Sequence, residues 1–196
     1  MALTKVRTGG ITDANVTTAK VADDAVTAAK MGSDYKQGIT FYETMRMNAN
    51  LSSGTGGDIS QTFESTDTGP HAKLLIGGSG MSASSGIFTF PATGIYLLMS
   101  QIRIYADADI QYNSHTINTT VDNGANWVES AQTFAGWGTH YSGSNYESMS
   151  LQYIFDCTNT STHKFKMRYG STGTVTVAGN TDANETFVTV IRLGDT

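Results

Sequence analysis

The chain is poor in cysteine, proline and charge, and these shortages exclude several classes of protein. Its 196 residues include a single cysteine, Cys157, so no disulfide can form within the chain and the fold cannot depend on oxidation. Only 15% of the residues are charged, against a usual ~25%. The net charge of -5 gives no broad electrostatic attraction to nucleic acid or to an anionic membrane. We therefore expect no nucleic-acid partner.

Long apolar runs are also missing. No window approaches the length that a membrane-spanning helix needs, and the first ten residues, MALTKVRTGG, contain no apolar core of the signal-peptide kind. We expect no membrane insertion. If the protein acts outside a cell, we expect it to leave by another route, such as lysis.

Glycine and aromatic residues are plentiful by contrast. The chain has 21 glycines but two prolines, and 10% of its residues are aromatic. Disordered chains lack this aromatic bulk, because they cannot close a core. The composition therefore favours a folded domain with many tight turns between strands.

A ten-residue unit occurs twice in residues 11–30, as ITDANVTTAK and VADDAVTAAK, and Met31 begins a third. Six positions of the unit hold the same or a similar residue, which argues against a flexible linker with chance periodicity. A unit this short cannot bury its apolar side chains within one chain and must bury them against neighbours. The large apolar side chains recur every five residues: Ile11, Val16, Val21, Val26 and Met31.

The spacing of five suits neither regular structure. On an α-helix, five residues advance ~140° beyond a full turn, which scatters these side chains around the axis. On a strand, an odd spacing alternates faces. Short helical turns remain open, with Asp23 or Asp24 as a cap and Gly32 as the stop. We expect an extended or intermittently helical arm, residues 1–36, that packs between chains or along another protein.

From residue 37 to residue 196 the chain reads as strands separated by glycine-rich turns, and no helical periodicity appears. Asp122, Asn123 and Gly124 predict a hairpin with a two-residue loop. About ten short antiparallel strands in one domain indicate an all-β sandwich or jelly roll. The predicted strands are 40–48, 72–76, 87–90, 94–106, 115–121, 127–134, 149–157, 164–169, 174–178 and 186–193.

The segment from Ser85 to Leu98, SGIFTFPATGIYLL, resembles the G-x-F-x-x-P-x-x-G-x-Y signature of the complement component one-q head and its tumour-necrosis-factor relatives. Residues 41–51, 119–124 and 186–193 resemble further strands of that family. The resemblance implies a ten-stranded jelly-roll head that forms a tight homotrimer, with aromatic and aliphatic residues along the threefold axis. The collagen-like stalk of the animal proteins is not seen.

The arm is similar to the N-terminal attachment regions of bacteriophage fibres, which carry runs like I-x-D-x-x-V-T-x-A-K. The two resemblances together imply a virion structural protein, a trimeric short fibre or spike that is assembled in the host cytoplasm. Its arm would bind other virion proteins, and its head would face outward and bind a host-surface glycan or receptor. A capsid decoration or cement protein is the alternative, since the chain has two repeats and no long shaft. A soluble lectin-like module is a third possibility.

No arrangement of residues indicates an enzyme. The stretch from Gly77 to Gly80 matches neither a nucleophile elbow nor a phosphate-binding loop and is expected to be a surface turn. Cys157 falls in phase with a buried strand face and is expected to be an inert core thiol. We predict no catalytic residue, no cofactor and no metal site. The four histidines, which lack the spacing of a zinc site, are His71, His115, His140 and His163.

One pair of carboxylates is a possible exception to the prediction of no metal site. Asp107 and Asp109 are expected on one strand face after Tyr105, where they could bind calcium, an ion that some members of the family hold.

Two surfaces are candidate ligand or partner sites. Lys164, Lys166 and Arg168 share one strand face, where they would either protect an exposed edge strand or bind an anionic partner such as a glycan or an acidic capsid patch. The second surface is an aromatic, polar loop from residue 127 to residue 146, which suits sugar rings or trimer packing equally. Its aromatic residues after the first tryptophan are Phe134, Trp137, His140, Tyr141 and Tyr146.

Overall fold

A computed structural model describes residues 39–66, 80–139 and 142–196, which belong to one folded unit that begins at Ile39. Four groups of sequence predictions lie wholly or mostly outside these residues. They are the arm at 1–36 with its five large apolar side chains, the strand at 72–76 with the nearby His71, the surface turn from Gly77 to Gly80, and the candidate Tyr141 with its neighbour His140.

The described residues form strands and no helix, which confirms the all-β prediction. No helix among them could therefore cross a membrane. The strands are β1 (Phe41–Met47), β2 (Leu51–Asp58), β3 (Phe63–Ser65), β4 (Ser82–Ser84), β5 (Ile87–Thr89), β6 (Gly94–Ala106), β7 (Ile110–Thr120), β8 (Val128–Trp137), β9 (Asn145–Cys157), β10 (Lys164–Val177) and β11 (Phe187–Gly194).

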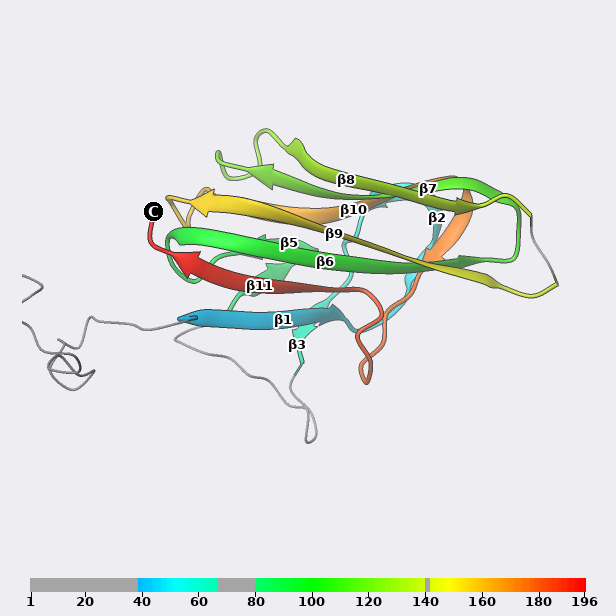
Figure 1. Ribbon diagram of the computed structural model, residues 1–196, viewed down its shortest axis with the longest axis horizontal. Coiled ribbons are helices and arrows are strands. Elements are labelled where there is room, and N and C mark those ends of the chain that lie inside the picture. The colour runs from blue at the N-terminus through cyan, green and yellow to red at the C-terminus, as the bar shows by residue number, and fades with distance from the viewer. Residues whose placement is uncertain (1–38, 67–79, 140–141) are drawn as a thin grey trace, which may run out of the picture. The chain divides into compact units, whose positions relative to one another are not determined.

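The strands form two layers, and every strand pair is antiparallel (Figure 1). Sheet I runs in the order β3-β1-β11-β6-β9. In sheet II, β10 is paired on one side with β7, which is followed by β8, and on the other side with β2 and then β5, which is followed by β4. The end of β10 also pairs with β6, at Thr176 and Val177, and joins the layers.

The core lies between the two sheets and is built by period-2 alternation. Buried and half-buried residues alternate along the whole of β6, as expected for a strand with one face on the core. Phe88 stacks on Phe165 with ring centroids 4.6 Å apart and planes 7° apart, and Phe90 packs on Tyr96 at 4.6 Å. The hydroxyl of Tyr96 donates to the carbonyl of Ala92 at 2.8 Å. The signature at 85–98 therefore supplies the centre of the core.

Several strand predictions were incomplete. The segments 164–169 and 174–178 belong to one strand, β10, whose pairing with β2 shifts register between Gly170 and Val175. β2 itself was missed because its sequence, LSSGTGGD, holds three glycines and no alternating apolar residues. It is held by backbone pairing to β10, which leaves no side-chain period in the sequence.

The connection from β7 to β8 is longer than the predicted two-residue loop and spans residues 121–127. Asn123 and Gly124 do have positive φ, at 60° and 90°. The loop is organised by the Asp122 carboxylate, which accepts hydrogen bonds from the Thr120 hydroxyl at 2.6 Å and from the backbone and side-chain nitrogens of Asn126 at 2.9 and 2.7 Å. These bonds lower the pKa of Asp122 to about 2.

Candidate functional site

Of the two roles considered for the three cations of β10, protection of a sheet edge does not apply, because β10 is paired on both sides. Asp58 of β2 forms ion pairs with two of them, and its single negative charge offsets one of their two positive charges. Its carboxylate lies 2.8 Å from Nζ of Lys166 and 2.8 Å from Nε of Arg168. Lys166 also lies over the ring of Trp127, with Nζ 4.4 Å from the ring centroid, and its side chain is only 13% exposed. Asp58 therefore pairs with two of the three cations, and the Trp127 ring covers one of them, Lys166.

The predicted aromatic loop is mostly strand. Residues 128–137 are β8, in which Ala131, Thr133, Ala135 and Trp137 are half-buried and alternate with exposed residues. The indole nitrogen of Trp137 donates to the carbonyl of Ala108 at 2.9 Å, and the ring packs against the core. We infer that Trp137 anchors β8.

The two carboxylates considered for calcium do not lie on the strand face expected for them. Because β6 ends at Ala106, Asp107 and Asp109 lie in the connection to β7 and do not share a strand face. No group of three metal-ligating side chains comes together within the described residues.

Cys157 is buried, as its phase predicts, and desolvation raises the pKa of its thiol to about 11. A thiol with this pKa stays protonated and unreactive near neutral pH.

Sheet I carries an apolar row on the face that points away from the core. The pairing register places Tyr42, Ile191, Leu97 and Ile154 side by side across β1, β11, β6 and β9. Ile154 is 59% exposed, and Tyr42, Ile191 and Leu97 are partly exposed. The row spans four strands, so this face holds more than the scattered apolar residues that are normal on a protein surface.

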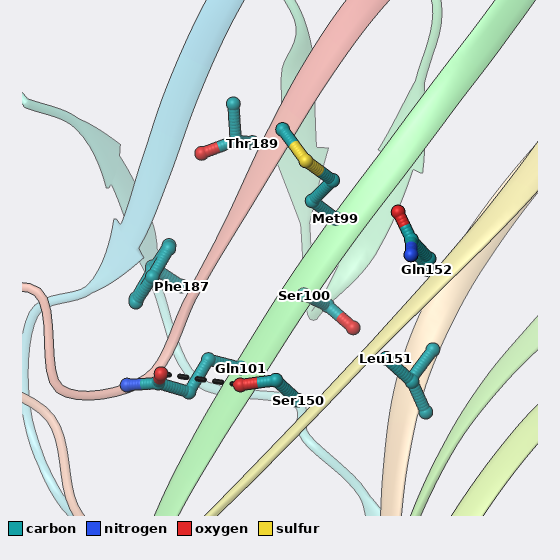
Figure 2. Close-up of a pocket in the computed structure, with 8 residues that line it drawn as sticks. All are labelled: Met99, Ser100, Gln101, Ser150, Leu151, Gln152, Phe187 and Thr189. Carbon is teal, nitrogen blue, oxygen red and sulfur yellow. Dashed lines mark hydrogen bonds between the residues drawn. The ribbon is translucent and has the colours of Figure 1, made fainter.

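A shallow hollow of about 370 Å³ lies next to this row (Figure 2). Its lining comes from β6, β9 and β11. The residues drawn in Figure 2 are Met99, Ser100, Gln101, Ser150, Leu151, Gln152, Phe187 and Thr189. The hollow extends the open face of sheet I toward the end of β6.

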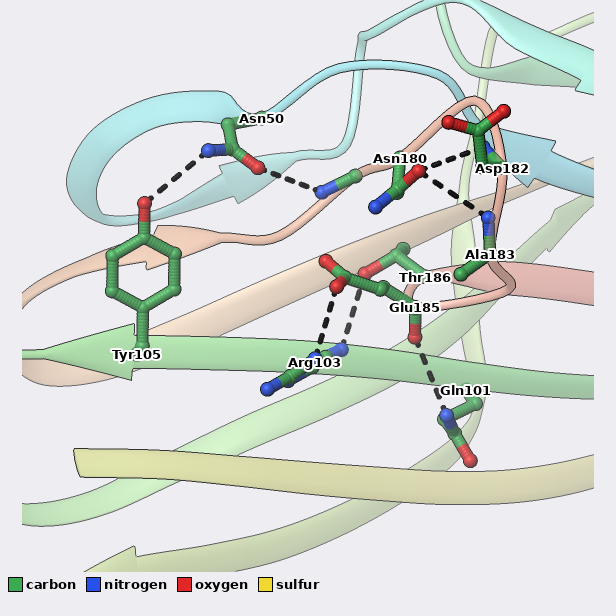
Figure 3. A network of polar contacts seen from close by, with 10 residues as sticks. Asn50, Gln101, Arg103, Tyr105, Asn180, Asp182, Ala183, Glu185 and Thr186 are labelled. Carbon is green, nitrogen blue, oxygen red and sulfur yellow. Dashed lines mark hydrogen bonds and ion pairs between the residues drawn. The ribbon is translucent and has the colours of Figure 1, made fainter. Parts of the chain in front are cut away.

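A second, polar hollow of about 310 Å³ lies at that end of β6. Figure 3 shows the polar contacts of several residues around it. Arg103 and Tyr105 of β6, Tyr146 of β9 and Glu185 of the β10–β11 connection line it.

One feature of the sequence could have predicted the apolar row, although the predictions above do not use it. Between residues 94 and 99 both phases of β6 are apolar, with Ile95, Leu97 and Met99 on the face opposite Tyr96 and Leu98. Two apolar faces predict a strand that is covered on both sides. The polar hollow has no comparable signal, because its residues come from separate loops and strands.

Comparison with known proteins shows the fold. No protein-family model and no curated protein matches the chain. Two crystal structures of murine APRIL, one at pH 8.5 and one at pH 5.0, are similar to the chain, with TM-scores of 0.50 and 0.51 respectively. Each is 12% identical in sequence, and each alignment covers 78% of this chain and 99% of the APRIL chain. The chain folds as a tumour-necrosis-factor-like jelly roll. This confirms the fold that the signature at 85–98 predicted, and at 12% identity the jelly-roll likeness shows the fold alone.

Proposed function

We propose that this protein is a non-enzymatic structural protein of a bacteriophage virion, a trimeric short fibre or spike. The N-terminal arm would attach it to other virion proteins, and the jelly-roll head would bind the host surface. The observation that carries the proposal is the apolar row of sheet I, which gives the head a face for self-association. The likeness of the repeats at 11–31 to phage attachment regions supports the virion role.

The chemistry of the row favours a second copy of the chain as the partner. Tyr42, Leu97, Ile154 and Ile191 carry no charge, so a neighbour of the same composition can cover them without leaving a charge unpaired. Three copies related by a closed symmetry axis satisfy every such face. The number three follows from the family resemblance.

A trimeric head would also explain why so short an arm suffices. Three arms attached to one head bind as a group, and the effective concentration of the second and third arms multiplies modest contacts. The head and the arm therefore support each other within one proposal.

The first prediction concerns self-association. Ile154→Asp should raise the dissociation constant of each interface about 100-fold, or ~2.7 kcal/mol, because assembly would bury an unpaired carboxylate. Sedimentation velocity across a concentration series measures the change. Val121→Asp is the matched control, since Val121 is 61% exposed but lies in the β7–β8 connection. Equal masses for Ile154→Asp and the parent protein, across the whole series, would contradict the proposed interface.

The second prediction concerns the arm. Deleting residues 1–36 should leave a soluble trimeric head that no longer enters phage particles. A full-length variant with serine at Val16, Val21 and Val26 keeps the length of the arm but removes apolar side chains, and it should fail in the same way. Particle incorporation is measured by gradient purification and immunoblotting. If the serine variant enters particles normally, the arm acts only as a spacer.

A capsid decoration role is the second candidate, favoured by the short chain with its two repeats. The two roles separate in phage that lack the protein. A fibre predicts poor adsorption to the host, and isolated head should block adsorption of intact phage. A decoration protein predicts normal adsorption but particles that burst at lower temperature.

A further inference from the structure

The polar hollow at the end of β6 has the composition of a small-molecule site. Its volume of about 310 Å³ lies at the lower end of the ~300–1,000 Å³ typical of ligand pockets. It combines aromatic faces with a few convergent polar groups, drawn from β6, β9, the β1–β2 turn and the β10–β11 connection.

Two tyrosines form one wall. Tyr105 and Tyr146 face each other across the β6–β9 pair, with ring centroids 5.2 Å apart. Tyr146 is 57% exposed although it lies within a regular strand. A flat, exposed aromatic face beside polar groups suits the apolar side of a ring that carries hydroxyls on its edge.

Arg103 and Glu185 supply the polar groups at the base. Nη1 of Arg103 lies 2.9 Å from Oε1 of Glu185, and the guanidinium carbon lies 4.7 Å from the ring centroid of Tyr146. The backbone N–H of Arg103 donates to the Thr186 hydroxyl at 3.1 Å, and the Gln101 side chain donates to the Glu185 carbonyl at 3.3 Å. These bonds fix the Glu185 segment against β6 before any ligand arrives.

The opposite rim is also held in place. Asn50 donates from Nδ2 to the Tyr105 hydroxyl at 3.2 Å and accepts from the backbone N–H of Gly179 at 2.9 Å (Figure 3). Since the Tyr105 oxygen accepts from Asn50, its own proton can be donated to a ligand. Prearranged groups of this kind lower the entropy cost of binding.

We propose that this pocket binds a neutral saccharide unit. The Tyr146 ring would stack on the apolar face of the sugar, while Tyr105, Arg103 and Glu185 would exchange hydrogen bonds with its hydroxyls. The Arg103–Glu185 pair carries no net charge, so the pocket offers an acidic sugar no unpaired cation and a neutral sugar is favoured. The site would specify the class of ligand in the proposed host-surface binding, and its biological role rests on that proposed function.

The pocket and the apolar row lie far enough apart for saccharide binding at one and self-association at the other. Arg103 lies six residues beyond Leu97 on β6, which at ~3.3 Å per residue separates them by roughly 20 Å. An interface centred on the row and less than about 20 Å in reach toward the end of β6 leaves the pocket accessible.

Saturation-transfer NMR on the full-length protein tests the proposal. The probes are glucose, galactose, mannose and N-acetylglucosamine, each alone, with N-acetylneuraminic acid as the charged comparison. At least one neutral sugar should bind with a Kd on the order of 1 mM. Tyr146→Ala should weaken that binding about tenfold. The matched control is Tyr112→Ala, which removes another exposed tyrosine, on β7, and should leave binding unchanged.

Three results would overturn the proposal: no saturation transfer to any neutral sugar, binding that Tyr146→Ala leaves intact, or binding of N-acetylneuraminic acid alone. The oligomeric mass is measured on the same samples. A trimer that binds no neutral sugar removes the saccharide site and leaves the proposed assembly standing. A monomer that binds one removes the assembly and leaves the site.

Discussion

Alanine at Gly86 is expected to destabilise the head by roughly 3–5 kcal/mol, since left-handed backbone and forced overlap both carry a cost. Gly86 lies in the turn between β4 and β5 with φ +74°, which an L side chain adopts at a penalty. A Cβ there would overlap the carbonyl oxygen of Ile59 and lie 2.8 Å from its carbonyl carbon and 3.0 Å from the Cα of Ser60. These are backbone atoms, so no side-chain rotation relieves the clash.

Urea unfolding followed by tryptophan fluorescence measures this loss. Gly138→Ala is the matched control, because no heavy atom beyond its two chain neighbours lies within 4 Å of the added Cβ, and it should change the free energy of unfolding by less than ~0.5 kcal/mol. Equal unfolding midpoints for Gly86→Ala and Gly138→Ala would show that the β4–β5 turn adapts and that the close approach is not needed.

Acid should destabilise the protein through His115, by about 2 kcal/mol at pH 5 and about 3 kcal/mol at pH 4 relative to neutral pH. His115 is fully buried between the sheets, and desolvation lowers its pKa to about 4, although a hydrogen bond to the Arg168 carbonyl opposes this shift. Nδ1 lies 3.2 Å from that carbonyl and Nε2 lies 2.7 Å from the Ser100 hydroxyl. Because a carbonyl only accepts, Nδ1 carries the proton and Nε2 accepts from Ser100.

The direction of the pH dependence follows from these two states. The unfolded chain binds a proton at His115 near pH 6.5, whereas the folded chain resists it until about pH 4. The stability contributed by neutral His115 is therefore complete above pH 6.5 and is lost as the pH falls toward 4.

Denaturant unfolding between pH 7 and pH 4 measures this dependence. His115→Gln should flatten the curve. A curve for His115→Gln that is as steep as the parent's would assign the acid sensitivity to other groups.

The sequence was most informative where side chains alternate across a core. β6 was predicted with its observed bounds, and β9 with its observed end but a start four residues late, because buried residues such as Tyr96, Leu98, Met149 and Phe155 recur at a period of two. Alternation fails where glycine replaces side chains, as in β2. It also fails to show which strand is an edge, and for that reason the partners of Lys166 were missed.

Candidate sites were harder to predict than strands for a physical reason. The polar hollow joins Asn50, Tyr105 and Glu185, which lie far apart in the chain and meet only through the sheet topology. Trp137 looked like an exposed ring because its neighbours are glycine and threonine, but strand pairing turns it toward the core. The type of an aromatic residue can be read from a single sequence, but its exposure depends on the register in which its strand pairs with the next strand.

The central claim is that this jelly roll assembles through the open face of sheet I. The most direct test is the mass of the full-length protein in solution by sedimentation velocity, with Ile154→Asp beside it. The account predicts a parent protein with the mass of three chains, each 20.9 kDa, and smaller species for the variant. A parent protein that sediments as a single chain at every concentration, or a trimer that Ile154→Asp leaves unchanged, would contradict it.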